Sequence, residues 1–219
     1  MTARRIASLA TLRAADIYGL TAEEYSLGRG NVEVVRLLLQ AGVTVVQYRE
    51  KEKKAGEMYR ECQAIREMTR AAGAVFIVND HIDLAMLTDA DGVHVGQEDL
   101  PVAAVRQLVG PDRLIGLSTH APEEARQAEA SGMVDYIGVG PIFATRTKKD
   151  VCAPVGFDYL EFVAASIVLP FVAIGGIKEH NIGAVAARGA RTIALVTEIV
   201  GQPDIAAKVR ALREALGRS

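Results

Sequence analysis

The sequence VTVVQYREK, residues Val43–Lys51, starts as a strand of β-branched residues and ends in polar and charged ones. Because successive side chains of a strand point to opposite faces, Gln47, Arg49 and Lys51 project from the same face. Two cations at the end of an apolar strand repel each other and lose hydration unless an anion lies between them, and phosphates bind such cations strongly. The stretch therefore predicts a site for phosphate or pyrophosphate.

A second interpretation of the same stretch stays open at this point. Tyr48 and Glu50 project from the opposite face of the strand. In a charged surface loop, Glu50 and Glu52 would neutralise the two cations, and ion pairs of that kind contribute little free energy. A binding site, unlike a surface loop, requires further polar residues at the same place in the fold.

Segments with the same apolar character recur along the chain and alternate with segments of helical spacing. The strand candidates are Asp16–Thr21, Val43–Lys51, Val75–Val78, Gly92–Val95, Leu114–Leu117, Val134–Val139, Phe171–Ile174 and Thr192–Val196. The helix candidates are Asn31–Gln40, Lys54–Ala72, Ile82–Leu87, Pro101–Val109, Pro122–Ala130, Asn181–Ala187 and Pro203–Leu216. Alternation predicts a parallel sheet, and eight such units in 219 residues predict a single (β/α)8 TIM barrel over residues 1–219 rather than a doubly wound sheet. Active sites of this fold lie just after the strands, at the C-terminal face.

The composition argues against several classes of protein. Half of the residues are hydrophobic, 24% are charged and the formal net charge is −2, which opposes a broad basic surface for nucleic acid. Cys62 and Cys152 are too few for a disulfide scaffold or a zinc site and suit a reducing compartment. No run approaches the roughly 18–20 apolar residues of a membrane span, and Arg4, Arg5 and Arg13 do not frame a convincing signal peptide. We expect a cytoplasmic protein that binds neither nucleic acid nor membranes.

Two aspartates follow neighbouring strand candidates, where this fold carries its chemistry. Asp80 comes after the third strand and Asp99 after the fourth, beside the cationic strand. Mg²⁺ prefers one or two carboxylates together with water and phosphate oxygens, so the pair predicts a magnesium site. Each aspartate alone would also serve as a helix N-cap, Asp80 for Ile82–Leu87 and Asp99 for Pro101–Val109, and this alternative stays open.

A second phosphate site is predicted after the last two strands. Gly175 and Gly176 follow an apolar strand, and without side chains they let backbone N–H groups approach a phosphate. Residues Thr197–Val200 can form a short helical turn, and barrels often bind phosphate in the loops after strands seven and eight. The alternative is that the glycines serve only a tight turn.

The longest connection of the chain, Gly140–Gly156, follows the sixth strand. It contains Thr145, Arg146, Thr147 and Lys148. A loop of this length can act as a lid over the barrel mouth. A run of charges is more often solvated surface, but its position across the mouth favours a role in binding.

The histidines do not indicate nucleophilic catalysis. His94 is expected to pack inside the barrel, and His120 is expected at the rim of the pocket. Because no Cys–His or Ser–His pairing can be argued from the sequence, a covalent mechanism is disfavoured.

Six segments resemble a known family, the thiamine phosphate synthases, in that family's order. They are VQYREK, FIVNDHIDLA, DGVHVGQEDL, IGLSTH, DYIGVGPIFATRTKKD and AIGGI. The resemblance implies a (β/α)8 barrel that joins 4-amino-5-hydroxymethyl-2-methylpyrimidine diphosphate to a thiazole phosphate, plain or carboxylated, and releases pyrophosphate. It implies Mg²⁺ as the cofactor and the two phosphorylated substrates as partners, and a homo-oligomer is possible. Tyr48 departs from the family, where Leu is usual, and Thr197 replaces a common Ser.

The resemblance also implies roles for individual residues. The pyrimidine diphosphate would contact Gln47, Tyr48, Arg49, Glu50, Lys51, Asn79, Ser118 and Lys148. The thiazole phosphate would contact Thr145, Arg146, Thr147, Gly176, Val196 and Thr197. Asp80 and Asp99 would bind Mg²⁺, and the catalytic residues would be Arg49, Lys51, Lys148 and Ser118.

The implied mechanism is a dissociative substitution. Cations and Mg²⁺ stabilise the departing pyrophosphate, the aminopyrimidine carries the resulting carbocation, and the thiazole nitrogen captures it without an obligatory general base. Two alternatives are a thiazole tautomerase, which needs neither diphosphate grip nor metal, and a non-catalytic barrel that lost turnover. The full set of diphosphate grip and metal candidates argues against the first, and the presence of both aspartates with Lys148 argues against the second.

Overall fold

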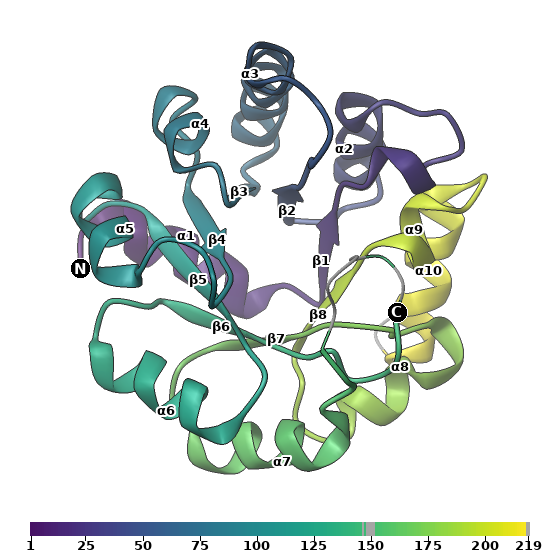
Figure 1. Cartoon of the computed structure of the whole chain (residues 1–219). Coiled ribbons are helices and arrows are strands. Elements are labelled where there is room, and N and C mark those ends of the chain that lie inside the picture. The colour runs from purple at the N-terminus through teal and green to yellow at the C-terminus, as the bar shows by residue number, and fades with distance from the viewer. Residues whose placement is uncertain (146, 148–151, 218–219) are drawn as a thin grey trace.

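The computed structural model describes residues 1–145, 147 and 152–217. Within these ranges, eight parallel strands close into a barrel in sequence order, with helices around it (Figure 1). The strands are β1 Ile17–Leu20, β2 Val45–Tyr48, β3 Val75–Asn79, β4 Gly92–Val95, β5 Leu114–Thr119, β6 Tyr136–Val139, β7 Phe171–Ala173 and β8 Thr192–Leu195. The barrel closes between β1 and β8, where Ile17 pairs with Ile193. The predicted (β/α)8 TIM barrel is confirmed.

A helix follows each of the eight strands, and α1 precedes β1. They are α1 Ala3–Ala14, α2 Asn31–Gln40, α3 Ala55–Ala72, α4 Ile82–Leu87, α5 Val102–Val109, α6 Pro122–Ser131, α7 Gly156–Ser166, α8 Glu179–Ala186, α9 Thr197–Val200 and α10 Ile205–Ala215, with a 3₁₀ helix η1 at Glu23–Tyr25. The predicted helices are all present with similar limits. In the part of the chain that the structure describes, no helix is both long and apolar enough to cross a membrane.

Two of these helices were not predicted from the sequence. The exposed face of α7 is weakly polar, because it holds the acidic Asp158 and Glu161 among alanines, and this blurs the pattern that marks an amphipathic helix. The buried residues of α7 are Tyr159, Leu160 and Val163. The residues of α1 precede the first strand and so lie outside the strand–helix alternation. This helix is capped by the Thr2 side chain, which accepts a hydrogen bond from the backbone of Arg5.

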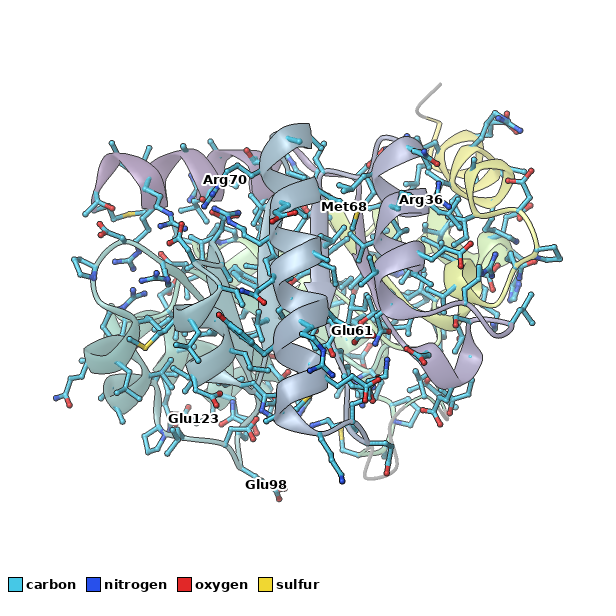
Figure 2. All side chains as sticks on the ribbon, turned by 90° about the horizontal axis from the view of Figure 1, so that it is seen from above. Arg36, Glu61, Met68, Arg70, Glu98 and Glu123 are labelled. Carbon is cyan, nitrogen blue, oxygen red and sulfur yellow. The ribbon has the colours of Figure 1, made fainter. Side chains whose placement is uncertain are left out.

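The alternation of side chains along the strands produces two hydrophobic layers. In β2, Val45 belongs to the layer inside the barrel, whereas Val46 and Tyr48 belong to the layer between the sheet and the helices. Leu9 and Leu12 of α1 join the inner layer, so α1 closes the N-terminal end of the barrel. In Figure 2, α1 crosses one end of the molecule with Arg70 nearby, and Glu98 lies at the opposite end. A cavity inside the barrel can therefore open only at the C-terminal end.

Candidate active site

The C-terminal ends of the strands surround a cavity of about 1010 Å³. Its described lining includes residues from every strand end, among them the following predicted site residues: Gln47, Arg49, Lys51, Asn79, Asp80, Asp99, Ser118, Thr145, Thr147, Gly176, Val196 and Thr197. Most of the predicted site residues that the structure describes thus line this cavity, as the rule that chemistry follows the strands requires. Arg146 and Lys148 lie outside the described residues, so their predicted roles stay predictions.

The side chains of Gln47, Arg49 and Lys51 all reach the cavity, as the alternation of β2 predicted. Gln47 is 3% exposed and donates a hydrogen bond to the Tyr18 hydroxyl at 2.9 Å. The backbone of Arg49 is fixed twice by Thr21, whose hydroxyl accepts from the Arg49 N–H at 2.8 Å and donates to its carbonyl at 3.0 Å. The cations are therefore carried on a segment whose backbone is held in place.

Tyr48 and Glu50, which the resemblance assigned to the substrate, do not line the cavity. Tyr48 is 1% exposed and belongs to the outer layer. Its hydroxyl donates a hydrogen bond at 2.6 Å to Glu61 of α3, which is labelled in Figure 2. Glu50 turns back on its own loop and accepts hydrogen bonds from the N–H groups of Lys51 at 2.7 Å and Glu52 at 3.0 Å. The physical reason is the alternation of strand side chains, which directs both residues away from the barrel interior. The described lining gives no support to the substrate contacts that the resemblance assigned to Tyr48 and Glu50, and these contacts stay predictions.

Asp80 and Asp99 line the same cavity and are not helix caps. The N-cap of α4 is His81 and that of α5 is Pro101, and neither position has a side-chain capping bond. Asp99 instead accepts from the backbone of Gly96 at 2.7 Å, and Asp80 forms an ion pair with Lys51. Asp80 has a φ of +58°, a left-handed conformation that Asp tolerates better than most residues.

The donor set at these aspartates fits Mg²⁺, because carboxylate oxygens are the hard ligands that this ion prefers. Among the described residues, no group of three or more His, Cys, Asp or Glu side chains is placed to hold a metal ion. A magnesium ion at Asp80 and Asp99 would therefore take its other ligands from water and phosphate oxygens. Lys51, paired with Asp80, would provide a neighbouring positive charge for such phosphates.

A chain of buried polar groups forms the floor of the cavity and was not predicted from the sequence. The hydroxyl of Tyr136 lies 3.1 Å from that of Tyr18 and 3.1 Å from His94 Nδ1. His94 Nε2 lies 3.0 Å from the hydroxyl of Ser118, so His94 makes specific polar contacts in addition to packing in the barrel. Burial raises the pKa of Tyr136 well above its usual value, so this residue stays a neutral hydrogen-bonding group. Gly116 makes room for the chain, since a Cβ there would lie 2.2 Å from the Tyr136 ring.

The opposite wall of the cavity is formed after β6, β7 and β8. Gly176 has a φ of +64°, and a Cβ at this position would lie 2.6 Å from the carbonyl oxygen of Ala144 and 2.7 Å from Cβ of Phe143. The glycine is therefore required by close packing against the loop before α7 as well as by its backbone conformation. Thr197 begins α9, as predicted, and Thr145 and Thr147 place their hydroxyls 3.2 Å apart.

The same wall holds one histidine that was expected at the rim and one ion pair that the sequence analysis missed. His120, expected at the rim, lines the cavity with Nδ1 2.7 Å from the Gly140 carbonyl oxygen. Lys178 and Glu198 form an ion pair of 3.1 Å across the ends of β7 and β8. Their separation of twenty positions in the sequence gives no local pattern that would have indicated the pair.

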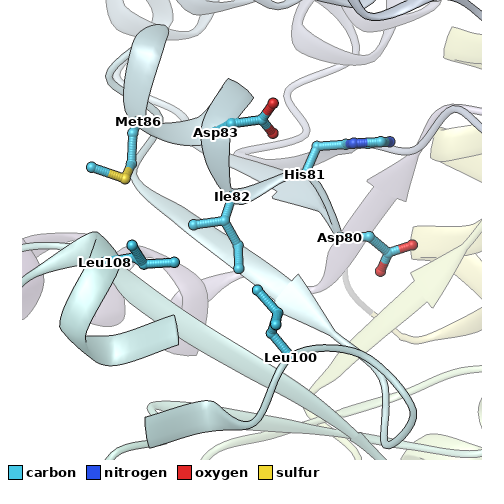
Figure 3. Close-up of a pocket in the computed structure, with 7 residues that line it drawn as sticks. All are labelled: Asp80, His81, Ile82, Asp83, Met86, Leu100 and Leu108. Carbon is cyan, nitrogen blue, oxygen red and sulfur yellow. The ribbon is translucent and has the colours of Figure 1, made fainter. Parts of the chain in front are cut away.

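A second, smaller hollow of about 380 Å³ lies next to Asp80 on the outside of the barrel. Figure 3 shows Ile82, Met86, Leu100 and Leu108 gathered there, with the Asp80 carboxylate turned away from them. The hollow is lined mainly by apolar side chains and does not contain the cations of β2. It shares Asp80 with the main cavity but none of the other predicted site residues.

The fold and the main cavity define a TIM-barrel enzyme whose C-terminal mouth carries cations, carboxylates and glycine turns suited to phosphorylated substrates. Comparison with known proteins identifies the family within this class. Residues 17–199 match the family model described as thiamine monophosphate synthase, and the chain belongs to this family.

Individual relatives agree with the family. The chain is 68% identical to the thiamine-phosphate synthase of Pelotomaculum thermopropionicum over 96% of each chain. It is 52% identical to the thiamine-phosphate synthase of Lawsonia intracellularis, over 92% of this chain and 93% of that protein. The solved thiamine phosphate pyrophosphorylase of Pyrococcus furiosus superposes with a TM-score of 0.85 at 33% identity, over 95% of this chain and 98% of that one. The predicted activity, that of a thiamine phosphate synthase and therefore a transferase, is confirmed by these relatives.

Proposed function

We propose that this chain joins 4-amino-5-hydroxymethyl-2-methylpyrimidine diphosphate to a thiazole phosphate, releasing pyrophosphate in a Mg²⁺-dependent reaction. The observation that supports this most directly is the division of one cavity into two polar walls. Arg49, Lys51, Asp80 and Asp99 lie after β2, β3 and β4, whereas Gly176 and Thr197 lie after β7 and β8. Two phosphorylated substrates would thus be held side by side with their reacting atoms over the floor.

The wall at β2 to β4 is proposed to bind the diphosphate. Arg49 and Lys51 would bind its oxygens through charge-assisted hydrogen bonds, with Lys51 exchanging Asp80 for phosphate. Asp80 and Asp99 would hold Mg²⁺, which when bound supplies positive charge to the departing oxygens. Lys148 is proposed, from the resemblance alone, to act on the same leaving group.

The floor is proposed to hold the pyrimidine ring. Gln47, Asn79 and Ser118 present amide and hydroxyl groups to the cavity. The bond between the pyrimidine methylene carbon and the diphosphate oxygen would break with both electrons leaving on pyrophosphate. The lone pair of the thiazole nitrogen would then form the new carbon–nitrogen bond, so that no proton transfer is needed.

The wall after β6 to β8 is proposed to hold the thiazole phosphate. Thr145, Thr147 and Thr197 would donate hydroxyl hydrogen bonds, Gly176 would offer its N–H, and Val196 would contact the ring. Arg146 is assigned to the same phosphate by resemblance only. A cytoplasmic location and a possible homo-oligomer remain predictions from the sequence.

The proposed reaction is tested by incubating the purified chain with both substrates and Mg²⁺, and oxidising the product to fluorescent thiochrome. We expect fluorescence and equimolar pyrophosphate only when both substrates and Mg²⁺ are present. Omission of each component in turn provides the controls, and a chelator followed by excess Mg²⁺ tests reversibility. Absence of product in the complete mixture, with the protein shown to be folded by circular dichroism, would overturn the proposal.

A further inference from the structure

The cavity wall around Gly176 and Thr197 carries an ionised carboxylate that a phosphate must approach. Glu198 follows Thr197 in α9, lines the cavity and is only 9% exposed. Burial raises the pKa of Glu198, but its hydrogen bonds to Lys208 and Lys178 outweigh this and leave the pKa below the usual value. The carboxylate is therefore negative at neutral pH, and without compensation it would repel a phosphate bound beside it.

Two lysines compensate this charge from different sides. Lys178 Nζ lies 3.1 Å from one Glu198 oxygen, and Lys208 Nζ lies 3.0 Å from the other. Lys208 belongs to α10, which packs against α8 and α9 on the outside of the barrel, and its side chain is 17% exposed and also pairs with Glu179 (Figure 1). Lys178 belongs to the turn before α8, lines the cavity and has a side chain that is 49% exposed.

Glu198 keeps sufficient partners if Lys178 leaves it. Besides Lys208, the Glu198 carboxylate accepts a hydrogen bond from the N–H of Glu179 at 3.3 Å. Lys178 can therefore turn toward a phosphate without leaving a buried carboxylate unpaired, which would otherwise be expensive. The described lining of the cavity contains Arg49, Lys51 and Lys178 as its Lys and Arg residues. Arg49 and Lys51 follow β2, so among these described residues Lys178 alone lies after β7 and β8.

We propose that Lys178 is a further binding residue for the phosphate of the thiazole substrate, and that Glu198 is the positioning residue that holds its ammonium group at the cavity wall. The inference rests on the proposed function, and it identifies the cation that neutralises this phosphate on the β7–β8 side. Thr197 and Gly176 supply neutral donors, so Lys178 contributes most of the described positive charge there.

The test compares Lys178→Gln with the matched variant Lys208→Gln. Each removes one ammonium group from Glu198, but only Lys178 lines the cavity. We expect Lys178→Gln to raise KM for the thiazole phosphate about tenfold, as for the loss of one partly exposed charge-assisted hydrogen bond, with KM for the pyrimidine diphosphate nearly unchanged. Lys208→Gln should raise KM for the thiazole phosphate much less, and Lys178→Arg should restore most of the binding.

A second measurement isolates the phosphate. Calorimetric Kd values for the thiazole phosphate and for the corresponding thiazole alcohol are compared in the wild-type protein and in Lys178→Gln. We expect the variant to lose affinity for the phosphorylated compound only. Equal losses for both compounds, or equal effects of Lys178→Gln and Lys208→Gln, would show that the ion pair is merely structural and would overturn the inference.

The outcomes also separate this inference from the proposed function. If the wild-type protein forms no thiamine phosphate, the proposed function fails. If the wild type turns over normally and Lys178→Gln, folded by circular dichroism, keeps the wild-type KM for the thiazole phosphate, only the role of Lys178 fails.

Discussion

The two ends of the barrel use charge in opposite ways. At the N-terminal end, Asp135 has a side chain only 2% exposed and accepts from Arg5 at 2.6 Å and Arg106 at 2.8 Å. At the C-terminal end, the pair of Lys51 and Asp80 is more open, and its cation is 48% exposed. The carboxylate of the closed end is shared by two protein cations, and its pair with Arg5 holds α1 in place. At the open end, the exposure of Lys51 would let it exchange Asp80 for a ligand, as the proposed phosphate site requires.

The largest expected effect is on stability, at the closed end. Replacing Asp135 by Ala removes the shared partner of Arg5 and Arg106 and the acceptor for the N–H of Ile115 at 2.8 Å. Breaking a buried ion pair from one side lowers the free energy of unfolding by about 3 kcal/mol or more. Urea denaturation followed by circular dichroism measures the loss. A loss of less than about 1 kcal/mol would mean that the closed end is not held by this carboxylate.

The matching change at the open end is expected to alter activity and not stability. Asp80→Asn keeps the left-handed backbone, which Asn also tolerates, and removes the charge that pairs with Lys51. We expect kcat to fall about 100-fold, the size of losing one preorganised electrostatic contact, and the Mg²⁺ requirement to rise. Asp99→Asn should have the same effects on kcat and on the Mg²⁺ requirement. Unchanged Mg²⁺ titrations of turnover in both variants would exclude the aspartates as metal ligands.

The same contrast explains what could be predicted from the sequence. The fold was predictable because each strand and most helices carry their own periodicity, and the mouth followed from the rule that chemistry lies after the strands. The helix α1 could not be predicted in the same way, because it belongs to no strand–helix unit and closes the barrel through Leu9, Leu12 and long-range pairs such as Arg5–Asp135. The polar face of α7 is weak, because only Asp158 and Glu161 stand among alanines there.

Within the site, local patterns predicted which residues face the cavity, but not what they contact. The alternation in β2 correctly placed Tyr48 and Glu50 away from Arg49, and it was the resemblance that added them to the substrate set. The chain from Tyr18 through Tyr136 to His94 joins β1, β6 and β4, so it depends on barrel closure and has no signal in any single segment. Its hints in the sequence were Tyr18, His94 and Tyr136, each a polar side chain in a strand otherwise made of aliphatic residues and glycine.

A third prediction sharpens the division of the open end into two walls. Gly176→Val is a poor test, because a side chain there would collide with Ala144 and Phe143 and displace the loop. Thr197→Val removes only the hydroxyl and is expected to raise KM for the thiazole phosphate about tenfold, and Thr197→Ser should be near wild type. Arg49→Ala should instead raise KM for the pyrimidine diphosphate. Saturation curves for both substrates decide, and equal effects of both variants on both substrates would mean a single shared site.

The smallest expected effect concerns the pH dependence of the closed end. Burial raises the pKa of Asp89, but the hydrogen bond and charge of Arg4, with the charges of Arg66 and Arg113, outweigh it and lower the pKa below the usual value. A carboxylate with a lowered folded pKa stabilises the protein above its unfolded pKa, near 4, and loses this contribution as the pH falls through the folded pKa. Because the side chain is 45% exposed, the contribution should be below about 1 kcal/mol. Asp89→Asn keeps the positive φ of +52°, which Asn tolerates, and removes only the charge. The free energy of unfolding of this variant should therefore lie slightly below that of the wild type at pH 7 and converge with it toward pH 3. Parallel urea titrations across this range measure the difference, and a constant offset at all pH values would show that Asp89 acts through its shape and not its charge.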